Sequence, residues 1–197
     1  MEARIPDADG VILAAGYSSR AGAFKLALPL GGRAVIQRAV EGMAPFVRRI
    51  LVVTGHHAER VAALVADHPQ VTLVHNEGYA AGMLSSIQAG AAQVSAPRFF
   101  LLPGDHPLIA PDVCRRLLAV AALVVQPTYG GHGGHPILLA SALIPEILAL
   151  PADATLRDLL RRTPSVRVEV EDDGILLDLD TSDDYARLAQ RLADAPQ

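Results

Sequence analysis

A loop near the N-terminus carries two cations among small residues, a combination suited to binding phosphate. The apolar residues 10–13 before it are typical of a buried strand, and the small residues 14–16 let a ligand approach the backbone. Backbone N–H groups of such a loop can bind phosphate oxygens, while Arg20 and Lys25 supply the opposite charge. The residues predicted to contact the phosphate-bearing ligand are Leu13, Ala14, Ala15, Gly16, Arg20 and Lys25.

This loop differs from the two commoner loops that bind nucleotide phosphates. A Walker loop needs a Ser or Thr after its Lys, and Leu26 follows Lys25 here. A dinucleotide-binding loop needs glycines where this chain has Ala14 and Ser19. A different kind of phosphate loop is therefore predicted, and the alternative is a Gly- and Ser-rich turn with two solvated cations.

A carboxylate that follows a later apolar segment could bind a metal ion. Asp105 lies between Gly104 and Pro107, after residues 99–102, which predict a strand. Mg²⁺ prefers carboxylate oxygen and usually takes one or two protein carboxylates together with substrate phosphates. Asp105 is therefore a candidate metal ligand, with a role in a turn or helix cap as the alternative.

A second carboxylate near the C-terminus could complete this site. Asp178 and Asp180 alternate with leucines, so on a strand both acids would face the same side. Thr181 is expected to cap the last helix, with two aspartates favourable in its first turn. Asp180 could therefore bind the metal or serve only the end of that helix.

Polar and glycine-rich segments elsewhere offer further contacts. Asn76 follows a predicted strand, and its amide could both donate to and accept from a base or ribose. Gly82 opens a predicted helix whose first N–H groups are free to contact a ligand. His132 and His135 lie in a glycine-dense loop with no cysteine nearby, which makes only a weak case for zinc.

Strand-like and helix-like segments alternate along most of the chain. Strands are predicted at residues 10–13, 50–54, 71–75, 99–102, 124–125 and 137–139, and helices at 59–66, 84–91 and 113–120. This alternation predicts an α/β fold with a doubly wound, mostly parallel sheet and helices on both faces. Because ligands bind at the carboxyl ends of strands in such sheets, the loops after Leu13, His75 and Leu102 are expected to meet.

The C-terminal part is expected to differ from this alternation. Residues 166–170 and 175–179 resemble two strands, and Gly174 between them favours a hairpin turn. No repeat, linker or low-complexity segment divides the chain, so residues 1–197 are predicted to form a single domain.

Composition excludes several classes of protein. About half of the 197 residues are hydrophobic, so a sizeable core is possible, and a net charge of −4 with scattered cations argues against a nucleic-acid surface. Cys114 is the only cysteine, which excludes a disulfide framework. The acidic start of the chain does not resemble a secretory leader, and the apolar run 117–125 is too short to span a bilayer. A cytoplasmic protein with no membrane partner is expected.

Several of these segments together resemble the molybdopterin nucleotidyltransferases (MobA-like NTP transferases), and within them the molybdenum cofactor cytidylyltransferase branch. The first loop reads L-A-A-G-x-S-x-R-x-G-x-x-K, and residues 104–108 match the family's G-D-x-P-L segment, with His106 where Met is common. Residues 76–86 match N-x-x-x-x-x-G-M-x-x-S, and residues 131–136 match G-x-x-G-H-P. Residues 178–184 resemble D-x-D-T-P-E-D, with Ser182 in place of Pro.

The resemblance implies a Rossmann-like nucleotidyltransferase fold and Mg²⁺-dependent transfer of a nucleotide to an acceptor phosphate, with release of pyrophosphate. It implies catalytic roles for Arg20, Lys25, Asp105 and Asp180. Asp105 and Asp180 are the implied metal ligands, with Asp178 as the fallback. The implied nucleotide contacts also include Asn76, Gly82 and Ser85.

The resemblance also bears on the substrates. Ala15 gives the L-A-A-G of the members that use CTP, whereas members that use GTP tend to show L-A-G-G. CTP and molybdopterin are therefore the implied small-molecule partners, with transient contact to a molybdoenzyme or its chaperone. The alternatives are guanylyl transfer to molybdenum cofactor, nucleotidyl transfer to a sugar or polyol phosphate, and a non-catalytic carrier of the cofactor. An NAD-dependent oxidoreductase is disfavoured because its glycine pattern is missing and no acid ends the strand at 50–54.

Overall fold

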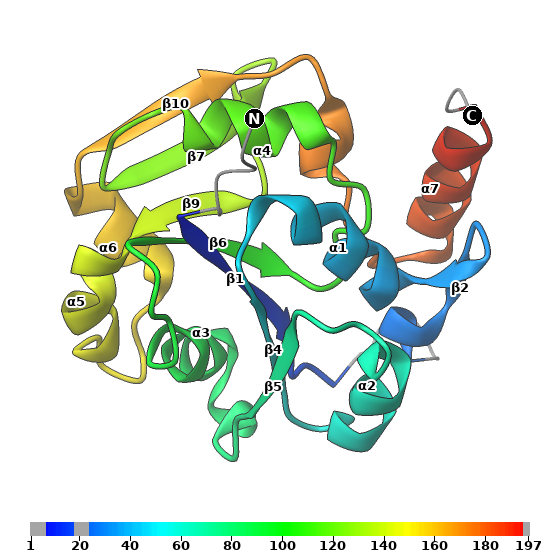
Figure 1. The fold of residues 1–197 in the computed structure, drawn as a ribbon, viewed down its shortest axis with the longest axis horizontal. Helices are drawn as coiled ribbons and strands as arrows, with labels where there is room; N and C mark the ends of the chain where they lie inside the picture. The colour runs from blue at the N-terminus through cyan, green and yellow to red at the C-terminus, as the bar shows by residue number, and fades with distance from the viewer. Residues whose placement is uncertain (1–6, 18–23, 195–197) are drawn as a thin grey trace.

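The computed structural model describes residues 7–17 and 24–194, and its centre is an eight-stranded sheet in the order β10-β7-β9-β6-β1-β4-β5, with β8 paired to β7. The strands are β1 (Ala8–Ala14), β4 (Ile50–Thr54), β5 (Val71–His75), β6 (Arg98–Pro103), β7 (Val124–Tyr129), β8 (His132–Gly133), β9 (Ile137–Ala140) and β10 (Ser165–Glu169). Along that order every pairing is parallel except the two that β9 makes with β6 and β7. The predicted doubly wound, mostly parallel α/β fold is confirmed (Figure 1).

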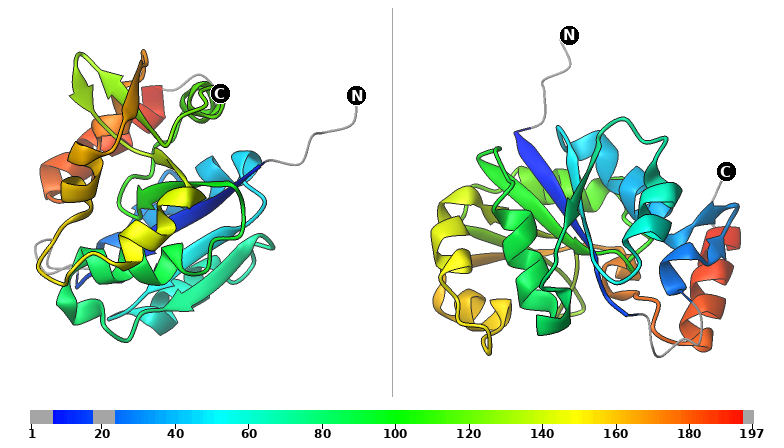
Figure 2. Two further views of the ribbon diagram at one scale, coloured as in Figure 1. Left: turned by 90° about the vertical axis from the view of Figure 1, so that its left-hand side faces the viewer. Right: turned by 90° about the horizontal axis from the view of Figure 1, so that it is seen from below.

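Helices cover both faces of this sheet, as Figures 1 and 2 show. They are α1 (Val35–Met43), α2 (Ala58–Val65), α3 (Met83–Ala91), α4 (Pro111–Leu118), α5 (Ile144–Leu148), α6 (Leu156–Arg162) and α7 (Ser182–Asp194). Helices α1, α2, α4 and α7 contribute to one hydrophobic cluster, and α3, α5 and α6 contribute to the other. Among the described residues, no helix is long and apolar enough to cross a bilayer.

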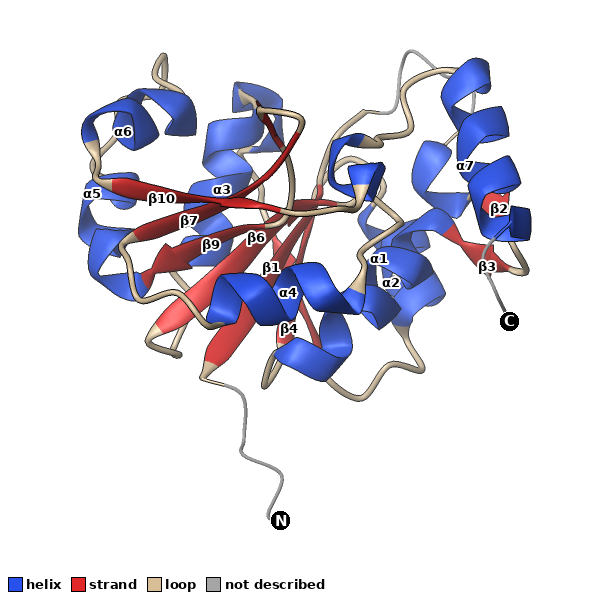
Figure 3. Ribbon diagram, turned by 90° about the horizontal axis from the view of Figure 1, so that it is seen from above, coloured by secondary structure: helices blue, strands red, loops and turns tan. Residues whose placement is uncertain are grey.

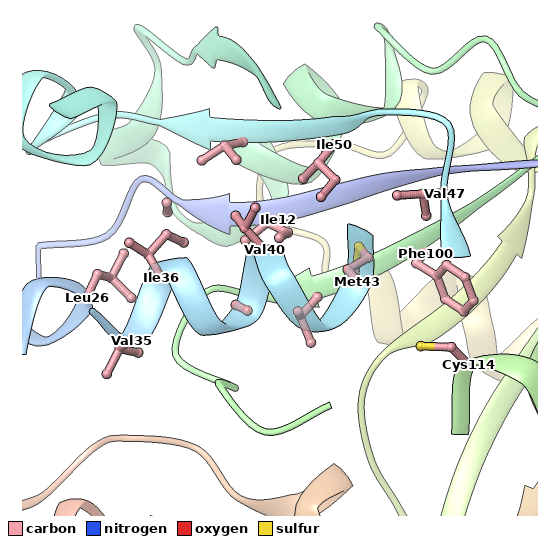
Figure 4. Close-up of a cluster of buried hydrophobic side chains, with 14 of the residues drawn as sticks. Ile12, Leu26, Val35, Ile36, Val40, Met43, Val47, Ile50, Phe100 and Cys114 are labelled. Carbon is pink, nitrogen blue, oxygen red and sulfur yellow. The ribbon is translucent and has the colours of Figure 1, made fainter. Parts of the chain in front are cut away.

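Alternation along the central strands builds these two cores. On β1, Ile12 enters the cluster shared with α1, while Val11 enters the cluster shared with α3. On β6, Phe100 enters the first cluster and Phe99 enters the second, and all four side chains are fully buried. Figure 4 shows the first cluster between the sheet and α1. Because successive strand residues face opposite sides, a continuous apolar strand requires helices on both faces.

The chain reverses direction across the sheet between β1 and β6. From β1 it runs outward through β4 and β5, and it then returns to add β6 on the other side of β1. In open α/β sheets, ligands bind at the carboxyl ends of strands where the order reverses in this way. The segments that follow β1 and β6 therefore lie on either side of the expected binding crevice.

The hairpin predicted near the C-terminus is wrong. Residues 165–169 form β10, which pairs in parallel with β7, but Asp173–Leu176 is a 3₁₀ helix, η6, and residues 177–194 contain no strand. Asp172 Oδ1 accepts a hydrogen bond from Gly174 N–H at 2.7 Å, and Arg191 pairs with both Asp172 and Asp173. These side-chain contacts hold the segment as a helical turn, because an Asp can hydrogen-bond the backbone two residues on and compete with strand formation.

The remaining short elements lie at the rim of the sheet. The 3₁₀ helix η2 (Lys25–Ala27) precedes a small hairpin of β2 (Pro29–Leu30) and β3 (Arg33–Ala34), which lies beside α7 (Figure 3). The other 3₁₀ helices are η3 (Ala44–Phe46), η4 (Tyr79–Ala81) and η5 (Ser141–Leu143). The glycine-dense loop is the turn between β7 and β8, with φ of 55° at Gly130 and 81° at Gly131. Positive φ at both positions suits a two-residue hairpin turn.

Candidate active site

The loops that follow three parallel strands meet at one edge of the sheet, as predicted. Gly104 N–H donates to the Leu13 carbonyl at 2.9 Å, which joins the segments after β6 and β1. His56 N–H donates to the Ala15 carbonyl at 3.3 Å, and the Tyr17 and Tyr79 rings lie 5.5 Å apart. These contacts add the segments after β4 and β5 to the same edge.

Two glycines permit this close approach. A Cβ at Gly104 would lie 2.9 Å from the Leu13 carbonyl oxygen, and one at Gly55 would lie 2.8 Å from the Ala15 carbonyl oxygen. Real Cβ atoms do not approach backbone oxygens so closely, so larger residues at these positions would push the loops apart. By contrast, a Cβ at Gly16 would enter open space, which leaves room for a ligand beside the first loop.

One lysine joins two acids from distant parts of the chain. Lys25 Nζ on η2 lies 2.5 Å from Asp105 Oδ2 and 3.0 Å from Asp180 Oδ1. These partners are 80 and 155 residues away in sequence. The side chains are 18%, 18% and 39% exposed respectively, so the group is sheltered but open to a ligand. We refer to Lys25, Asp105 and Asp180 as the lysine cluster.

The lysine cluster carries more negative than positive charge among the described residues. Burial alone would lower the pKa of Lys25, but the charges and hydrogen bonds of Asp105 and Asp180 raise it, so the ammonium stays protonated. Asp178 lies nearby, and burial together with repulsion from Asp105 and Asp180 raises its pKa. Among the described residues, three acids therefore lie near the Lys25 ammonium. Lys25 is also the only lysine in the chain, since sixteen of the seventeen basic residues are arginines.

The helix after Asp180 has its own cap. Thr181 Oγ1 accepts from Asp184 N–H at 3.2 Å, and Asp184 Oδ2 accepts from Thr181 N–H at 2.8 Å. The capping role predicted for Thr181 is confirmed, and the Asp184 side chain in turn caps the Thr181 backbone N–H. This arrangement leaves the Asp180 carboxylate directed to Lys25 rather than required for the helix end. Asp178 and Asp180 do not lie on a strand. The prediction that they face the same side of a strand is therefore wrong.

The carboxylates of the lysine cluster fit a divalent cation that is bound partly by substrate. Within the described residues, no group of three or more His, Cys, Asp or Glu side chains is arranged to hold a metal ion. Asp105 Oδ2 and Asp180 Oδ1 nevertheless contact the same Nζ, so the fold brings these two carboxylates to one place. Two carboxylates completed by phosphate oxygens are the donor set that Mg²⁺ commonly takes.

Asn76 and Ser85 are held by the protein on the other side of the first loop. Asn76 Nδ2 donates to Ser85 Oγ at 2.9 Å and to Ser86 Oγ at 3.1 Å, and its Oδ1 accepts from Gly78 N–H at 3.0 Å. Ser85 Oγ lies within hydrogen-bonding distance of the Gly78 and Gly82 carbonyls. Asn76 therefore shapes the turn that leads into α3 and presents Gly82, which has a φ of 105° and open space at its Cα. Arg20, the remaining predicted site residue, lies outside the described residues.

Two histidines at this edge were not assigned a role from the sequence. The rings of His106 and His135 lie 4.9 Å apart, with planes inclined by 61°. Burial lowers the pKa of both, and the nearby His106 helps to lower that of His135 to about 4. Sequence offered two separate signals, a departure from the family pattern at His106 and a Gly-His-Pro segment at His135. Only the pairing of β6 with β9 brings them together.

Comparison with known proteins now identifies the family. Residues 10–168 match the model of the MobA-like NTP transferase domain. This chain belongs to that family. It is therefore a nucleotidyltransferase, as the sequence predicted.

Individual relatives cover almost the whole chain. The molybdenum cofactor cytidylyltransferase of Escherichia coli (strain K12) is 31% identical, over 93% of this chain and 96% of the relative. The molybdenum cofactor guanylyltransferase of Burkholderia orbicola (strain MC0-3) is 26% identical, over 94% and 97% respectively. Rv0371c from Mycobacterium tuberculosis H37Rv, in a crystal structure in complex with manganese, superposes with a TM-score of 0.76 and 28% identity, over 93% of this chain and 98% of that protein.

Proposed function

We propose that this nucleotidyltransferase moves CMP from CTP to the phosphate of molybdopterin and releases pyrophosphate. The observation that supports this most directly is the lysine cluster, where one ammonium and two convergent carboxylates lie at the reversal point of the sheet. Such a group can stabilise a triphosphate and hold a cation that bridges phosphate oxygens. No protein nucleophile is required, because positioning and charge neutralisation can account for phosphoryl-group transfer.

In this proposal each member of the site has a separate task. Lys25, together with Arg20, neutralises the triphosphate and the pyrophosphate that leaves when an acceptor oxygen attacks the α-phosphorus. Asp105 and Asp180 hold a divalent cation, which supplies charge neutralisation at the phosphate oxygens when bound. Mg²⁺ is the proposed ion, and the manganese complex of Rv0371c supports a divalent cation in general.

The proposed nucleotide site lies along the first loop and the start of α3. Leu13, Ala14, Ala15 and Gly16 contribute backbone to the phosphates and base, and Gly82 contributes from the other side of the crevice. Asn76 and Ser85 act in this proposal through the turn that they stabilise, since their polar atoms already hydrogen-bond within the protein.

The choice of CTP is supported by Ala15 and by the cytidylyltransferase relative. Ala15 is 4% exposed, and its carbonyl accepts a hydrogen bond from His56 N–H. The methyl group that distinguishes Ala15 from a glycine therefore cannot move aside easily. The guanylyltransferase relative supports the second candidate, which is guanylyl transfer to the same acceptor. We also infer that the product passes to a molybdoenzyme or its chaperone.

The test is a panel assay for pyrophosphate release with Mg²⁺. CTP, GTP, ATP and UTP are each supplied with molybdopterin, and CTP is then supplied with sugar and polyol phosphates. The proposal expects the fastest release with CTP and molybdopterin together, and no release when the acceptor is left out. Preference for GTP would support the guanylyl alternative, and preference for a sugar or polyol phosphate would overturn molybdopterin as the acceptor.

The uniqueness of Lys25 allows a direct test of nucleotide binding. An amine-reactive reagent attacks the neutral amine, so the reaction is run at a pH high enough to modify Lys25 in the absence of CTP, because Asp105 and Asp180 raise the pKa of this side chain. Lys25→Ala serves as the control for reaction at the N-terminal amine. Bound CTP and Mg²⁺ should protect Lys25 from modification, as measured by mass spectrometry of the peptide that contains it. Equal modification with and without CTP would contradict contact between Lys25 and the triphosphate.

A further inference from the structure

The start of α2 contacts the residue that comes immediately before Lys25. Phe24 is 6% exposed and is the N-cap residue of η2, the short helix that carries Lys25. The centres of the Phe24 and His57 rings lie 4.4 Å apart, and the guanidinium carbon of Arg60 lies 4.6 Å from the centre of the Phe24 ring. The N-cap residue of α2 and a residue of its first turn therefore both contact Phe24.

Both contacts are favourable for an aromatic ring. The planes of the His57 and Phe24 rings are inclined by 54°, one of the tilted arrangements that aromatic pairs prefer over direct face-to-face stacking. The guanidinium of Arg60 lies over the Phe24 ring, where the electrons of the ring attract a cation. Each contact restricts how the Phe24 side chain can move.

His57 is itself fixed by its neighbours. Its ring N–H donates a hydrogen bond to the Tyr17 backbone, and the His56 ring lies 4.4 Å away. Partial burial, with repulsion from His56 and Arg60, lowers the pKa of His57, so the ring is neutral at pH 7 and does not repel Arg60. His57 is therefore a fixed support for Phe24 rather than a mobile surface side chain.

The helix that carries Lys25 needs such a support. It has three residues, and its backbone hydrogen bonds are Ala27 N–H to the Phe24 carbonyl at 3.0 Å and Leu28 N–H to the Lys25 carbonyl at 3.2 Å. A 3₁₀ helix of this length is weakly stabilised by its own hydrogen bonds, so its orientation depends on contacts with other elements. Lys25 must nevertheless reach two acids from distant parts of the chain.

We propose that His57 and Arg60 are positioning residues, which hold the Phe24 ring and thereby keep Lys25 between Asp105 and Asp180. The consequence for catalysis rests on the proposed function, in which Lys25 neutralises the triphosphate. A displacement of about 1 Å at a group that acts on the reaction can lower the rate about a hundredfold, although the substituted residue touches no substrate.

The position of Lys25 can be measured without any substrate. Protein labelled with ¹⁵N-lysine has one side-chain ammonium signal in NMR spectra, because Lys25 is the only lysine. Hydrogen bonds to the two carboxylates slow the exchange of the ammonium hydrogens with water. His57→Ala should speed this exchange about tenfold, the factor for losing one hydrogen bond to a charged group. Arg60→Met keeps the apolar stem without the cation and should have a smaller effect in the same direction.

A matched control removes an arginine from another helix. Arg161 on α6 is also exposed, but α6 packs against the hydrophobic cluster on the other face of the sheet. Arg161→Met should therefore leave the exchange of the Lys25 ammonium unchanged. Unchanged exchange in both His57→Ala and Arg60→Met would overturn the inference.

A variant of Phe24 tests whether the effect passes through its ring. Leu keeps an apolar side chain at this buried position but removes the aromatic face. Phe24→Leu should itself speed the exchange, and His57→Ala should then add little, because two changes that break the same contact are not additive. If His57→Ala keeps its full effect in Phe24→Leu protein, His57 does not act through Phe24 and the inference fails. Chemical denaturation checks that each variant is folded.

Activity separates positioning from a general loss of stability. With CTP and molybdopterin saturating, His57→Ala should lower kcat about tenfold, because a misplaced charge stabilises the transition state less well. In Lys25→Ala protein the same change should lower kcat no further, because no ammonium remains to be positioned. A loss of equal size in both backgrounds would contradict positioning. If wild-type protein releases no pyrophosphate with any acceptor, the proposed function fails, and the exchange measurement still decides whether α2 positions Lys25.

Discussion

Two groups of charges lie at opposite ends of the central strands, and they differ in how far water can reach them. At the amino edge, Asp9 on β1 is fully buried and accepts from the N–H groups of Ser95 and Ala96, at 2.8 and 3.1 Å. Arg48 and Arg49 each pair with the same carboxylate at 3.3 Å. At the carboxyl edge, Lys25 pairs with both Asp105 and Asp180, and Asp178 lies close by.

The difference separates a structural cluster from a binding site. Every oxygen of Asp9 is satisfied by donors of the protein, so the carboxylate ties β1 to the segments that precede β4 and β6 and has nothing left to offer a ligand. The lysine cluster is partly exposed and has a surplus of negative charge among the described residues, so it can gain from a bound cation. Access to solvent, rather than the presence of charge alone, distinguishes the two.

Lys25→Ala should give the largest effect on activity and little effect on folding. Loss of a charge-assisted contact that strengthens in the transition state costs about 2.7–4 kcal/mol, which is about a hundredfold to a thousandfold in kcat. The measurement is pyrophosphate release at saturating NTP, with circular dichroism to check the fold. Turnover close to wild type would remove Lys25 from the mechanism.

Asp9→Asn should produce the reverse pattern. Removing one partner of a buried ion pair costs about 3 kcal/mol in the free energy of unfolding, because the neighbouring donors lose a charged acceptor. Activity at moderate temperature should remain, since Asp9 is at the other edge of the sheet. Chemical denaturation together with the pyrophosphate assay tests both parts. A stable variant that has lost its activity would contradict the division between the two clusters.

Asp9→Asn should also change how the free energy of unfolding depends on pH in the acid range. Burial would raise the pKa of Asp9, but the N–H groups of Ser95 and Ala96 and the two arginines lower it below its ordinary value of 3.8. The ionised carboxylate therefore contributes stability above pH 3.8 that is lost as pH falls toward the lowered pKa. Asp9→Asn should lack this part of the acid dependence.

The acids of the lysine cluster should depend on one another. Asp105→Asn and Asp180→Asn should each raise the barrier by about 1.5–3 kcal/mol and increase the Mg²⁺ concentration needed for half-maximal rate. The double variant should be little worse than the weaker single variant, because the two carboxylates act as a unit. Asp178→Asn is the matched control, since it changes a neighbouring acid for which no contact with Lys25 is seen. A larger loss for Asp178→Asn than for Asp180→Asn would reassign the second metal ligand to Asp178.

Ala15→Gly should have the smallest effect, limited to the choice of base. A change of one methyl group alters discrimination by about 1–3 kcal/mol, so the ratio of kcat/KM for CTP to that for GTP should fall without reversing completely. By comparison, Lys25→Ala should lower kcat/KM for CTP and for GTP by the same factor. Wild-type preference for GTP would refute the assignment of Ala15.

Local sequence was sufficient for the central strands and for the helices α2, α3 and α4, but it did not predict α1, α5 or α6. The apolar run before Ala14 and the Gly-Asp-His-Pro-Leu segment predicted where strands end, and the alternation of elements predicted the sheet. The prediction of a hairpin after residue 170 was wrong because the Asp172 side chain caps its own turn, and because Arg191, from the last helix, binds that turn. Strand propensity cannot anticipate a partner that lies 19 residues away and competes for the same segment.

Sequence by itself determined that this chain has strands buried on both faces, a loop of small residues and cations after the first strand, and two acidic segments at distant positions. Each of these depends on a local pattern of apolar, small or charged residues. Only the tertiary structure decided that Lys25 lies between Asp105 and Asp180, and that His106 meets His135. The order of strands in the sheet sets those meetings, and that order depends on how two hydrophobic cores pack rather than on any one segment.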